Sequence, residues 1–120
     1  MNDRQLLDVQ IDGDVLVIRL DVVSISAMSD IEQITQLFRQ SVQEHQPRHL
    51  VVDFSSVRFF SSQMLGLLVD VWRKLHDSGG AVAVCGINPQ LTRVFRITNL
   101  DKLFLFYETV QQAIHAIRAA

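Results

Sequence analysis

Short apolar runs that suit buried strands alternate with amphipathic segments that suit helices along most of this chain. The predicted strands cover residues 7–11, 15–20, 49–54, 81–85 and 103–106. The predicted helices cover residues 30–45, 61–77 and 88–95, and a last helix follows Thr109. Two strands joined through a helix form a parallel crossover unit, because parallel strands cannot be joined by a tight turn. The order therefore predicts an α/β sandwich with four helices and a mostly parallel sheet.

The dipeptide Asp12-Gly13 separates the first two predicted strands. Glycine tolerates the positive φ of a primed two-residue turn, so Asp-Gly between alternating apolar residues predicts a β-hairpin. This hairpin should supply the antiparallel pair at the start of the sheet. No linker or low-complexity segment interrupts the chain, and its length suffices for a core, so we expect a single domain over residues 1–120.

Local signals also indicate where the helices begin. Ser29 or Asp30 can cap the helix over residues 30–45. Asn88 and Thr109 can cap the two later helices, because short polar side chains accept hydrogen bonds from free helix N–H groups. The helix over residues 61–77 carries an apolar stripe that should be buried, formed by Met64, Leu68, Val71, Trp72 and Leu75.

Three loops follow the carboxyl ends of predicted strands, at residues 21–29, 53–62 and 86–89. Ligands and partners of parallel sheets tend to bind at this edge. The segments should therefore meet there and hold any functional site.

Composition narrows the range of functions. The net charge of −2 gives no electrostatic case for binding nucleic acid or an anionic membrane. The single cysteine, Cys85, excludes an internal disulfide and is typical of a reducing compartment. The first ten residues lack an apolar signal core, and no apolar run approaches the ~20 residues of a membrane span. We therefore expect a cytoplasmic protein.

The sequence carries no recognisable catalytic or cofactor motif. There is no phosphate-binding glycine loop after a strand, and the four histidines lack the spacing of metal ligands. No histidine or lysine lies near Ser61 or Ser62 in sequence to act as a base. We therefore expect a protein that is not an enzyme and that uses no cofactor.

Asp53 ends a predicted central strand, where phosphoaspartyl receiver domains carry their acceptor. Such domains also need an acidic pair after the first strand and a lysine after the last one. Here only Asp21 follows the hairpin, and Lys102 precedes the last predicted strand. A turn in which the Asp53 side chain bonds the backbone of Ser55 or Ser56 is the favoured interpretation.

Two aromatic residues and two serines join this strand to the next helix. Phe59 and Phe60 are adjacent, so one of them should enter the core while the other can be exposed. Ser61 and Ser62 open the helix and can act as ordinary caps. The same position suits a phosphoserine, because free N–H groups and the positive end of the helix dipole stabilise a phosphate. Capping and phosphorylation are both open at this point.

The segment resembles the phosphorylation loop of STAS domains, the anti-sigma-factor antagonist family. The family pattern is a strand, Asp-Leu-Ser-x-Val, an aromatic or aliphatic residue, and Asp-Ser-Ser/Thr-Gly-Leu-Gly at a helix start. Residues 53–57 match the first half, Ser62 falls on the phospho-acceptor serine, and Leu65-Gly66 on the Leu-Gly pair. Further similarity, to the Gly-Gly strand at residues 79–85 and the Asn-Pro helix at 88–89, extends the resemblance over residues 48–118.

The resemblance implies a non-enzymatic switch. Its partners would be a serine kinase that also inhibits a sigma factor, and a serine phosphatase that resets the switch. Ser62 is the first choice of acceptor and Ser61 the second. The partner-binding residues would be Asp21, Ser24, Ser26, Ser61, Ser62 and Gln63.

Three positions of this segment depart from the family pattern, and the glycine of the family's Leu-x-Gly in the second strand is also absent, because the chain has Leu20-Asp21-Val22. Ser61 replaces the aspartate before the acceptor, and Gln63-Met64 replaces the Ser/Thr-Gly pair after it. These departures favour an alternative, a STAS scaffold or interaction module that is never phosphorylated.

Overall fold

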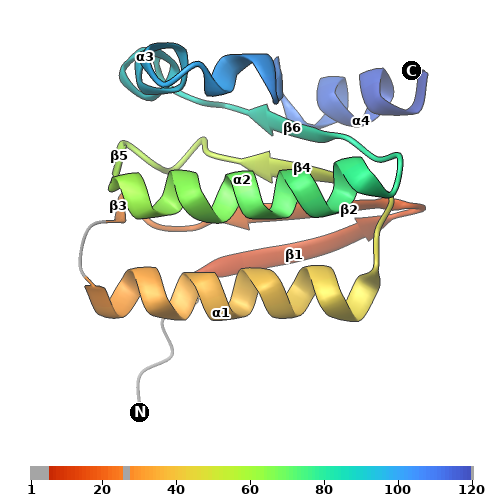
Figure 1. Cartoon of the computed structure of the whole chain (residues 1–120), viewed down its shortest axis with the longest axis horizontal. Coiled ribbons are helices and arrows are strands. Elements are labelled where there is room, and N and C mark those ends of the chain that lie inside the picture. The colour runs from red at the N-terminus through yellow and green to blue at the C-terminus, as the bar shows by residue number, and fades with distance from the viewer. Residues whose placement is uncertain (1–5, 26–27, 120) are drawn as a thin grey trace.

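The computed structural model describes residues 6–25 and 28–119, which form an α/β sandwich (Figure 1). The elements, in chain order, are β1 (Leu7–Asp12), β2 (Val15–Leu20), β3 (Ser24–Ile25), α1 (Met28–His45), β4 (His49–Asp53), β5 (Phe59–Phe60), α2 (Ser62–Asp77), β6 (Val82–Cys85), α3 (Pro89–Ile97), a 3₁₀ turn (Leu100–Lys102), β7 (Leu105–Tyr107) and α4 (Val110–Ala119). No helix of these residues is long and apolar enough to cross a bilayer.

The main sheet has five strands in the order β1-β2-β4-β6-β7. Strands β1 and β2 pair in antiparallel fashion, and every other pair in this sheet is parallel. Gly13 adopts a φ of +63° in the turn between β1 and β2, which is the conformation that made Asp12-Gly13 a hairpin signal. The predicted fold class, a mostly parallel sheet with an N-terminal hairpin and four helices, is confirmed.

Strand β4 occupies the middle of the sheet and is buried on both faces. Its residues Leu50, Val51 and Val52 are each 0% exposed. Leu50 and Val52 belong to the large core under α1, α2 and α3, whereas Val51 belongs to a smaller core that Ala113 and Ile117 of α4 cover. Because both faces of β4 are buried, its side chains are apolar on both faces and do not alternate with polar ones.

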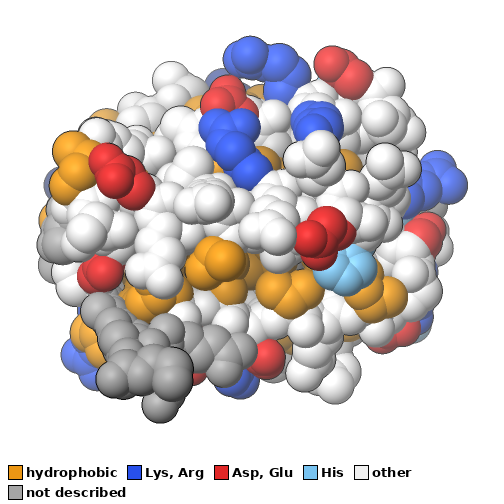
Figure 2. All heavy atoms as spheres, turned by 90° about the horizontal axis from the view of Figure 1, so that it is seen from below, with side chains coloured by type: hydrophobic (Ala, Val, Ile, Leu, Met, Phe, Trp, Pro, Cys, Tyr) orange, Lys and Arg blue, Asp and Glu red, His pale blue; other side chains and the backbone are white. Residues whose placement is uncertain are grey.

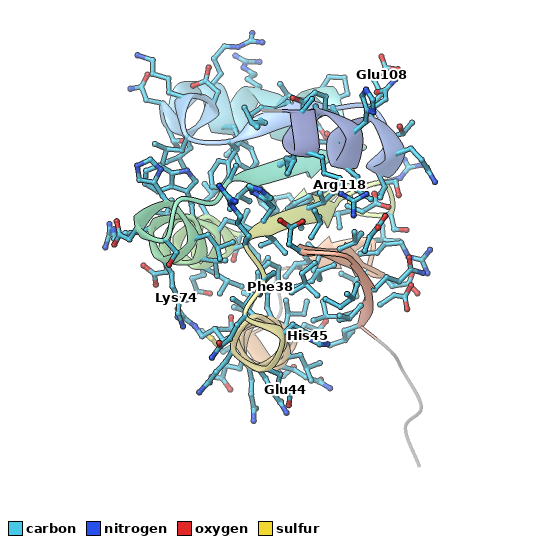
Figure 3. The ribbon with its side chains drawn as sticks, turned by 90° about the vertical axis from the view of Figure 1, so that its right-hand side faces the viewer. Phe38, Glu44, His45, Lys74, Glu108 and Arg118 are labelled. Carbon is cyan, nitrogen blue, oxygen red and sulfur yellow. The ribbon has the colours of Figure 1, made fainter. Side chains whose placement is uncertain are left out.

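The long helix α1 covers the large core and leaves part of strand β1 exposed. Figure 3 shows Phe38 pointing from α1 into the interior, while Glu44 points away from the molecule. Val9 of β1 is partly buried against the core, but Ile11, two residues further along the strand, is 48% exposed. Figure 2, which views the molecule from the α1 side, shows hydrophobic side chains in a row across this face.

Several local predictions are confirmed. Asn88 Oδ1 accepts from Leu91 N–H at 2.9 Å, and Thr109 Oγ1 accepts from Gln112 N–H at 3.1 Å, so both residues cap their helices. Four residues of the predicted α2 stripe are buried, and the fifth, Trp72, is partly buried and stacks on His76 with a ring distance of 4.6 Å.

Other local predictions need correction. Helix α1 begins at Met28 rather than at residue 30, so Ser29 and Asp30 lie within its first turn and do not cap it. The helix is inferred from its apolar stripe, and the first residue of that stripe is Ile31. The stripe therefore cannot show how many polar residues of the helix precede Ile31. The last strand is predicted over residues 103–106, whereas β7 covers Leu105–Tyr107. The 3₁₀ turn at Leu100–Lys102 ends just before residue 103, and the strand begins two residues later.

His49, at the start of β4, joins this strand to the segment before β6. Its Nδ1 accepts a hydrogen bond from Ala81 N–H at 3.0 Å, which requires an imidazole that is unprotonated at Nδ1. Burial lowers the pKa of His49 below the ordinary value of 6.5, the nearby Asp14 charge raises it, and Arg48 lowers it. The folded protein therefore favours the neutral ring.

This pKa shift predicts that stability falls in mild acid. As the pH falls below 6.5, His49 becomes protonated in the unfolded chain but stays neutral in the folded protein, where its pKa is lower. Because the unfolded state then binds more protons, the free energy of unfolding decreases as the pH falls. His49→Gln keeps an acceptor oxygen and does not titrate. Urea unfolding between about pH 7.5 and about pH 5.5 should therefore show a smaller loss for His49→Gln than for wild type. Parallel losses in the two proteins would contradict this prediction.

Candidate functional site

A short second sheet brings together two loops at the carboxyl ends of the strands. Strand β3 pairs with β5 in parallel, with Ser24 opposite Phe59 and Ile25 opposite Phe60. Arg58 N–H donates to Val23 O at 2.7 Å, and Ser61 N–H donates to Ile25 O at 2.9 Å. The loop after β2 thus holds the backbone that leads into helix α2. The sequence analysis treated this part of residues 21–29 as loop, because two-residue strands are too short to show a period.

Phe60 anchors this backbone in the core. Its ring packs edge-on against Phe54 at a centroid distance of 5.6 Å and tilted against Phe95 at 6.0 Å. Successive residues of a strand point to opposite sides, so Phe59 points outward and is 54% exposed. The prediction that one of the two phenylalanines is core and the other exposed is confirmed.

The third loop, residues 86–89, is tied to the same backbone through Asn88. Besides capping α3, its amide donates to Val57 O and to Arg58 O, both at 3.3 Å. Asp53 Oδ1 accepts from Ser55 N–H at 2.9 Å, which confirms the turn-forming interpretation of Asp53. Gly86 is needed beside this turn, because its φ is +68° and an added Cβ would lie 3.0 Å from Ser55 Cβ.

The two serines at the start of α2 have different environments. Ser61 occupies the N-cap position, yet its side chain makes no capping hydrogen bond. The Ser61 Oγ is buried and has no hydrogen-bond partner within the described part of the chain. Ser62 is the first helical residue and is exposed. Of the two hydroxyl groups, only that of Ser62 therefore lies on an exposed residue.

The two residues that follow Ser62 lie on different faces of α2, one exposed and one buried. Gln63 is exposed, whereas Met64, which replaces the glycine of the STAS pattern, is 0% exposed and belongs to the large core. The first turn of α2 contains no acidic residue. A negative charge at Ser62 would therefore meet the positive end of a helix without a like charge in that turn.

The remaining predicted contact residues lie in the loop after β2. Ser24 is exposed in β3, beside the strand that leads to Ser61. Asp21 is exposed at the end of β2, where its N–H donates to Leu6 O at 2.8 Å, so it faces the start of β1. Ser26 lies outside the described residues.

Exposed apolar side chains lie on the segments beside the start of α2, and the sequence analysis identified neither Val23 nor Met28 among them. Val23, Met28 and Phe59 are 61%, 58% and 54% exposed. Phe59 N–H donates to Val23 O at 3.3 Å, and Met28 lines the same hollow as Gln63. We call these three residues with Ser62 and Gln63 the Ser62 surface. Val23 in a loop and Met28 at the first position of α1 give no sequence signal of exposure, whereas the adjacent Phe59-Phe60 pair indicated that one of its members could be exposed.

The buried thiol of Cys85 lies in the strand that precedes the third loop. Burial raises the pKa of the Cys85 thiol to about 12, with a further contribution from the Asp53 charge, so Cys85 stays a neutral thiol at physiological pH. In residues 6–25 and 28–119 no three His, Cys, Asp or Glu side chains are grouped so as to hold a metal ion. What the arrangement offers is an exposed hydroxyl at a helix start within an apolar surface.

Fold and site together define a small α/β protein whose carboxyl-edge loops present a serine at the start of a helix. The sequence matches the STAS domain over residues 7–113, and the chain belongs to this family. The match confirms the resemblance from residue 48 as far as residue 113 and extends it to the N-terminal hairpin.

Named relatives and solved structures agree with this assignment. The anti-sigma F factor antagonist of Paenibacillus polymyxa is 27% identical over 75 residues, which cover 62% of this chain and 64% of that protein. This chain thus spans a little less than two thirds of that relative. The crystal structure of an anti-sigma factor antagonist from Mycobacterium paratuberculosis has a TM-score of 0.80 and 29% identity, covering 93% of this chain and 92% of that chain. A STAS domain protein from Planctomyces limnophilus has a TM-score of 0.77 and 30% identity, with coverages of 92% and 96%.

The dual role of Asn88 yields a prediction about the loop. Asn88→Ala removes a helix cap worth about 0.5–2 kcal/mol of stability and also both amide donors to the loop. Asn88→Asp is the matched control, because aspartate caps as well as asparagine but cannot donate to Val57 O and Arg58 O. Urea unfolding should therefore show the larger loss for Asn88→Ala.

Hydrogen–deuterium exchange separates the two roles. Amides 58–61 should exchange faster in both variants, because both lose the tether between α3 and the loop. Unchanged exchange of these amides in Asn88→Asp would show that the tether does not hold the loop.

Proposed function

We propose that this protein is a non-enzymatic, cofactor-free switch of the anti-sigma-factor antagonist type. In its unphosphorylated form it binds a serine kinase that also inhibits a sigma factor, and so releases that sigma factor. The kinase transfers a phosphoryl group from ATP to Ser62 Oγ, which releases ADP and a proton and ends the complex. A serine phosphatase then hydrolyses the phosphoester and restores the binding form.

The observation that carries this proposal is the position of Ser62. It is an exposed residue at the first position of a 16-residue helix, and the apolar side chains of the Ser62 surface adjoin it. An exposed hydroxyl is accessible to a kinase, and an exposed apolar surface is typical of a protein-binding site. Relatives named as anti-sigma factor antagonists support the same role.

Phosphorylation at this position should leave the fold intact. A phosphate adds about −1.5 to −2 charges at pH 7. At the start of a helix such a charge is stabilised by roughly 0.3–1 kcal/mol, because it interacts with the helix dipole and free N–H groups. Since the first turn of α2 holds no acidic residue, no repulsion within that turn opposes this gain.

The same charge should disrupt a complex. When a partner covers Val23, Met28 and Phe59, water leaves the surface around Ser62. A phosphate buried there without a dedicated cation must be desolvated, which costs several kcal/mol, and each ~1.4 kcal/mol lowers affinity tenfold. Binding therefore loses far more than folding gains, and this difference makes the site a switch.

Variants of Ser62 test this mechanism. Ser62→Asp should bind the cognate kinase at least about tenfold more weakly, while it melts near wild type. Ser62→Ala should bind constitutively and melt near wild type, because Ser61 and not Ser62 occupies the N-cap. Binding can be measured by calorimetry against each anti-sigma factor kinase encoded in the same genome, purified one by one. If Ser62→Asp and phosphorylated protein both bind as tightly as wild type, the protein is a scaffold.

The burial of the Ser61 hydroxyl oxygen predicts which serine is modified. After incubation with the cognate kinase and ATP, tandem mass spectrometry should locate a single phosphate on Ser62. Ser61→Ala should still be phosphorylated, and it should lose little stability because its hydroxyl makes no hydrogen bond among the described residues. A phosphate on Ser61 in the wild-type protein would contradict the assignment.

A further inference from the structure

Gly66 is an exposed glycine inside helix α2, one turn after Ser62. Glycine is the least favourable residue in a helix interior after proline, because it loses the most backbone entropy on folding. Some position-specific need usually offsets this cost. Among the described residues Gly66 shows none: apart from its two chain neighbours and the adjacent backbone of α2, no atom would lie within 4 Å of an added Cβ, and the φ is not positive.

The space beside Gly66 is part of a hollow between α1 and α2. The hollow measures about 490 Å³, and buried Ile31 and Leu67 contribute to its lining. Gln63 and Met28 of the Ser62 surface line the same hollow. A partner seated on Ser62 would therefore reach the hollow without leaving the protein surface.

The charged residues that line the hollow indicate which kind of side chain could bind there. Arg39 and Asp70 pair across the helices with a distance of 2.9 Å between Arg39 Nη2 and Asp70 Oδ2, so they largely neutralise each other. Glu32 also lines the hollow, is exposed, and makes no ion pair with any described residue. The lining thus combines apolar side chains and the uncharged polar residues Thr35, Gln36 and Gln63 with one negative charge that no described residue pairs.

We propose that this hollow is the second half of the partner interface, and that Gly66 is glycine so that the partner can approach the helix backbone closely. The occupant is a segment of the same serine kinase, with an apolar side chain over Ile31 and Leu67 and a lysine or arginine facing Glu32. This inference rests on the proposed function, but it assigns a role to residues that phosphorylation does not involve.

The first test needs no partner. Gly66→Ala should raise the melting temperature by about 2–5 °C, because alanine favours the helix and its Cβ meets no described atom beyond the adjacent part of α2. A lower melting temperature would mean that the glycine serves the fold of the monomer, and would overturn the proposal.

The second test measures binding to the cognate kinase by calorimetry. Gly66→Ala should weaken binding at least about threefold despite its greater stability, and Gly66→Trp at least about tenfold. Gln111→Trp is the control, because it places the same tryptophan side chain at an exposed position of α4, on the opposite face of the sheet. It should bind as wild type does.

Charge reversal provides an independent readout. Glu32→Lys should lower the association rate at low salt, and this effect should shrink as salt screens the charges. Glu108→Lys makes the same change at an exposed position beside α4, far from α1 (Figure 3), and should leave the rate unchanged.

The outcomes distinguish the two proposals. If Ser62→Asp loses binding while Gly66→Ala, Gly66→Trp and Glu32→Lys bind as wild type does, the switch stands and the hollow has no role. If wild type binds none of the purified kinases, the proposed function fails, and the role of Gly66 fails with it.

Discussion

The burial of strand β4 on both faces is the constraint on which the rest of the structure depends. Leu50, Val51 and Val52 are fully buried, so helices must cover the sheet on each side. Parallel strands β2 and β6 pair with β4, and crossover helices are what parallel neighbours require. The loops after β2, β4 and β6 therefore gather at one edge of the sheet. That edge carries the Ser62 surface.

A second constraint acts locally, through Phe60. Its ring lies among other phenylalanine rings of the core, and the pairing of β3 with β5 holds its backbone. Because residues of a strand alternate in direction, burying Phe60 exposes Phe59. The bond from Ser61 N–H to Ile25 O continues this pairing and leaves the Ser61 hydroxyl buried at the N-cap. Ser62 is then the next exposed residue after Phe59.

The exposed residues of the site contribute little to the stability of the folded monomer. Val23, Met28 and Phe59 remain largely in water, and Gly66 weakens its helix without relieving any contact. Large exposed apolar side chains that adjoin one another usually mark a binding surface. Natural proteins break local rules mainly at functional sites, and here the exceptions gather around one serine.

The sequence by itself determined the order of the four α-helices and of the five strands of the main sheet, and several of their ends. Apolar period and local capping chemistry are short-range properties, so the Asp12-Gly13 hairpin, the Asn88 cap and the Asp53 turn could be predicted. The tertiary structure alone decided which serine is exposed and that Val23 and Met28 join the same surface. Those properties depend on the β3–β5 pairing and on the packing of α1 beside α2, which join residues more than thirty positions apart in the chain. Two-residue strands show no period, and the exposure of a loop side chain is set by what folds over it, so local sequence could not reveal either.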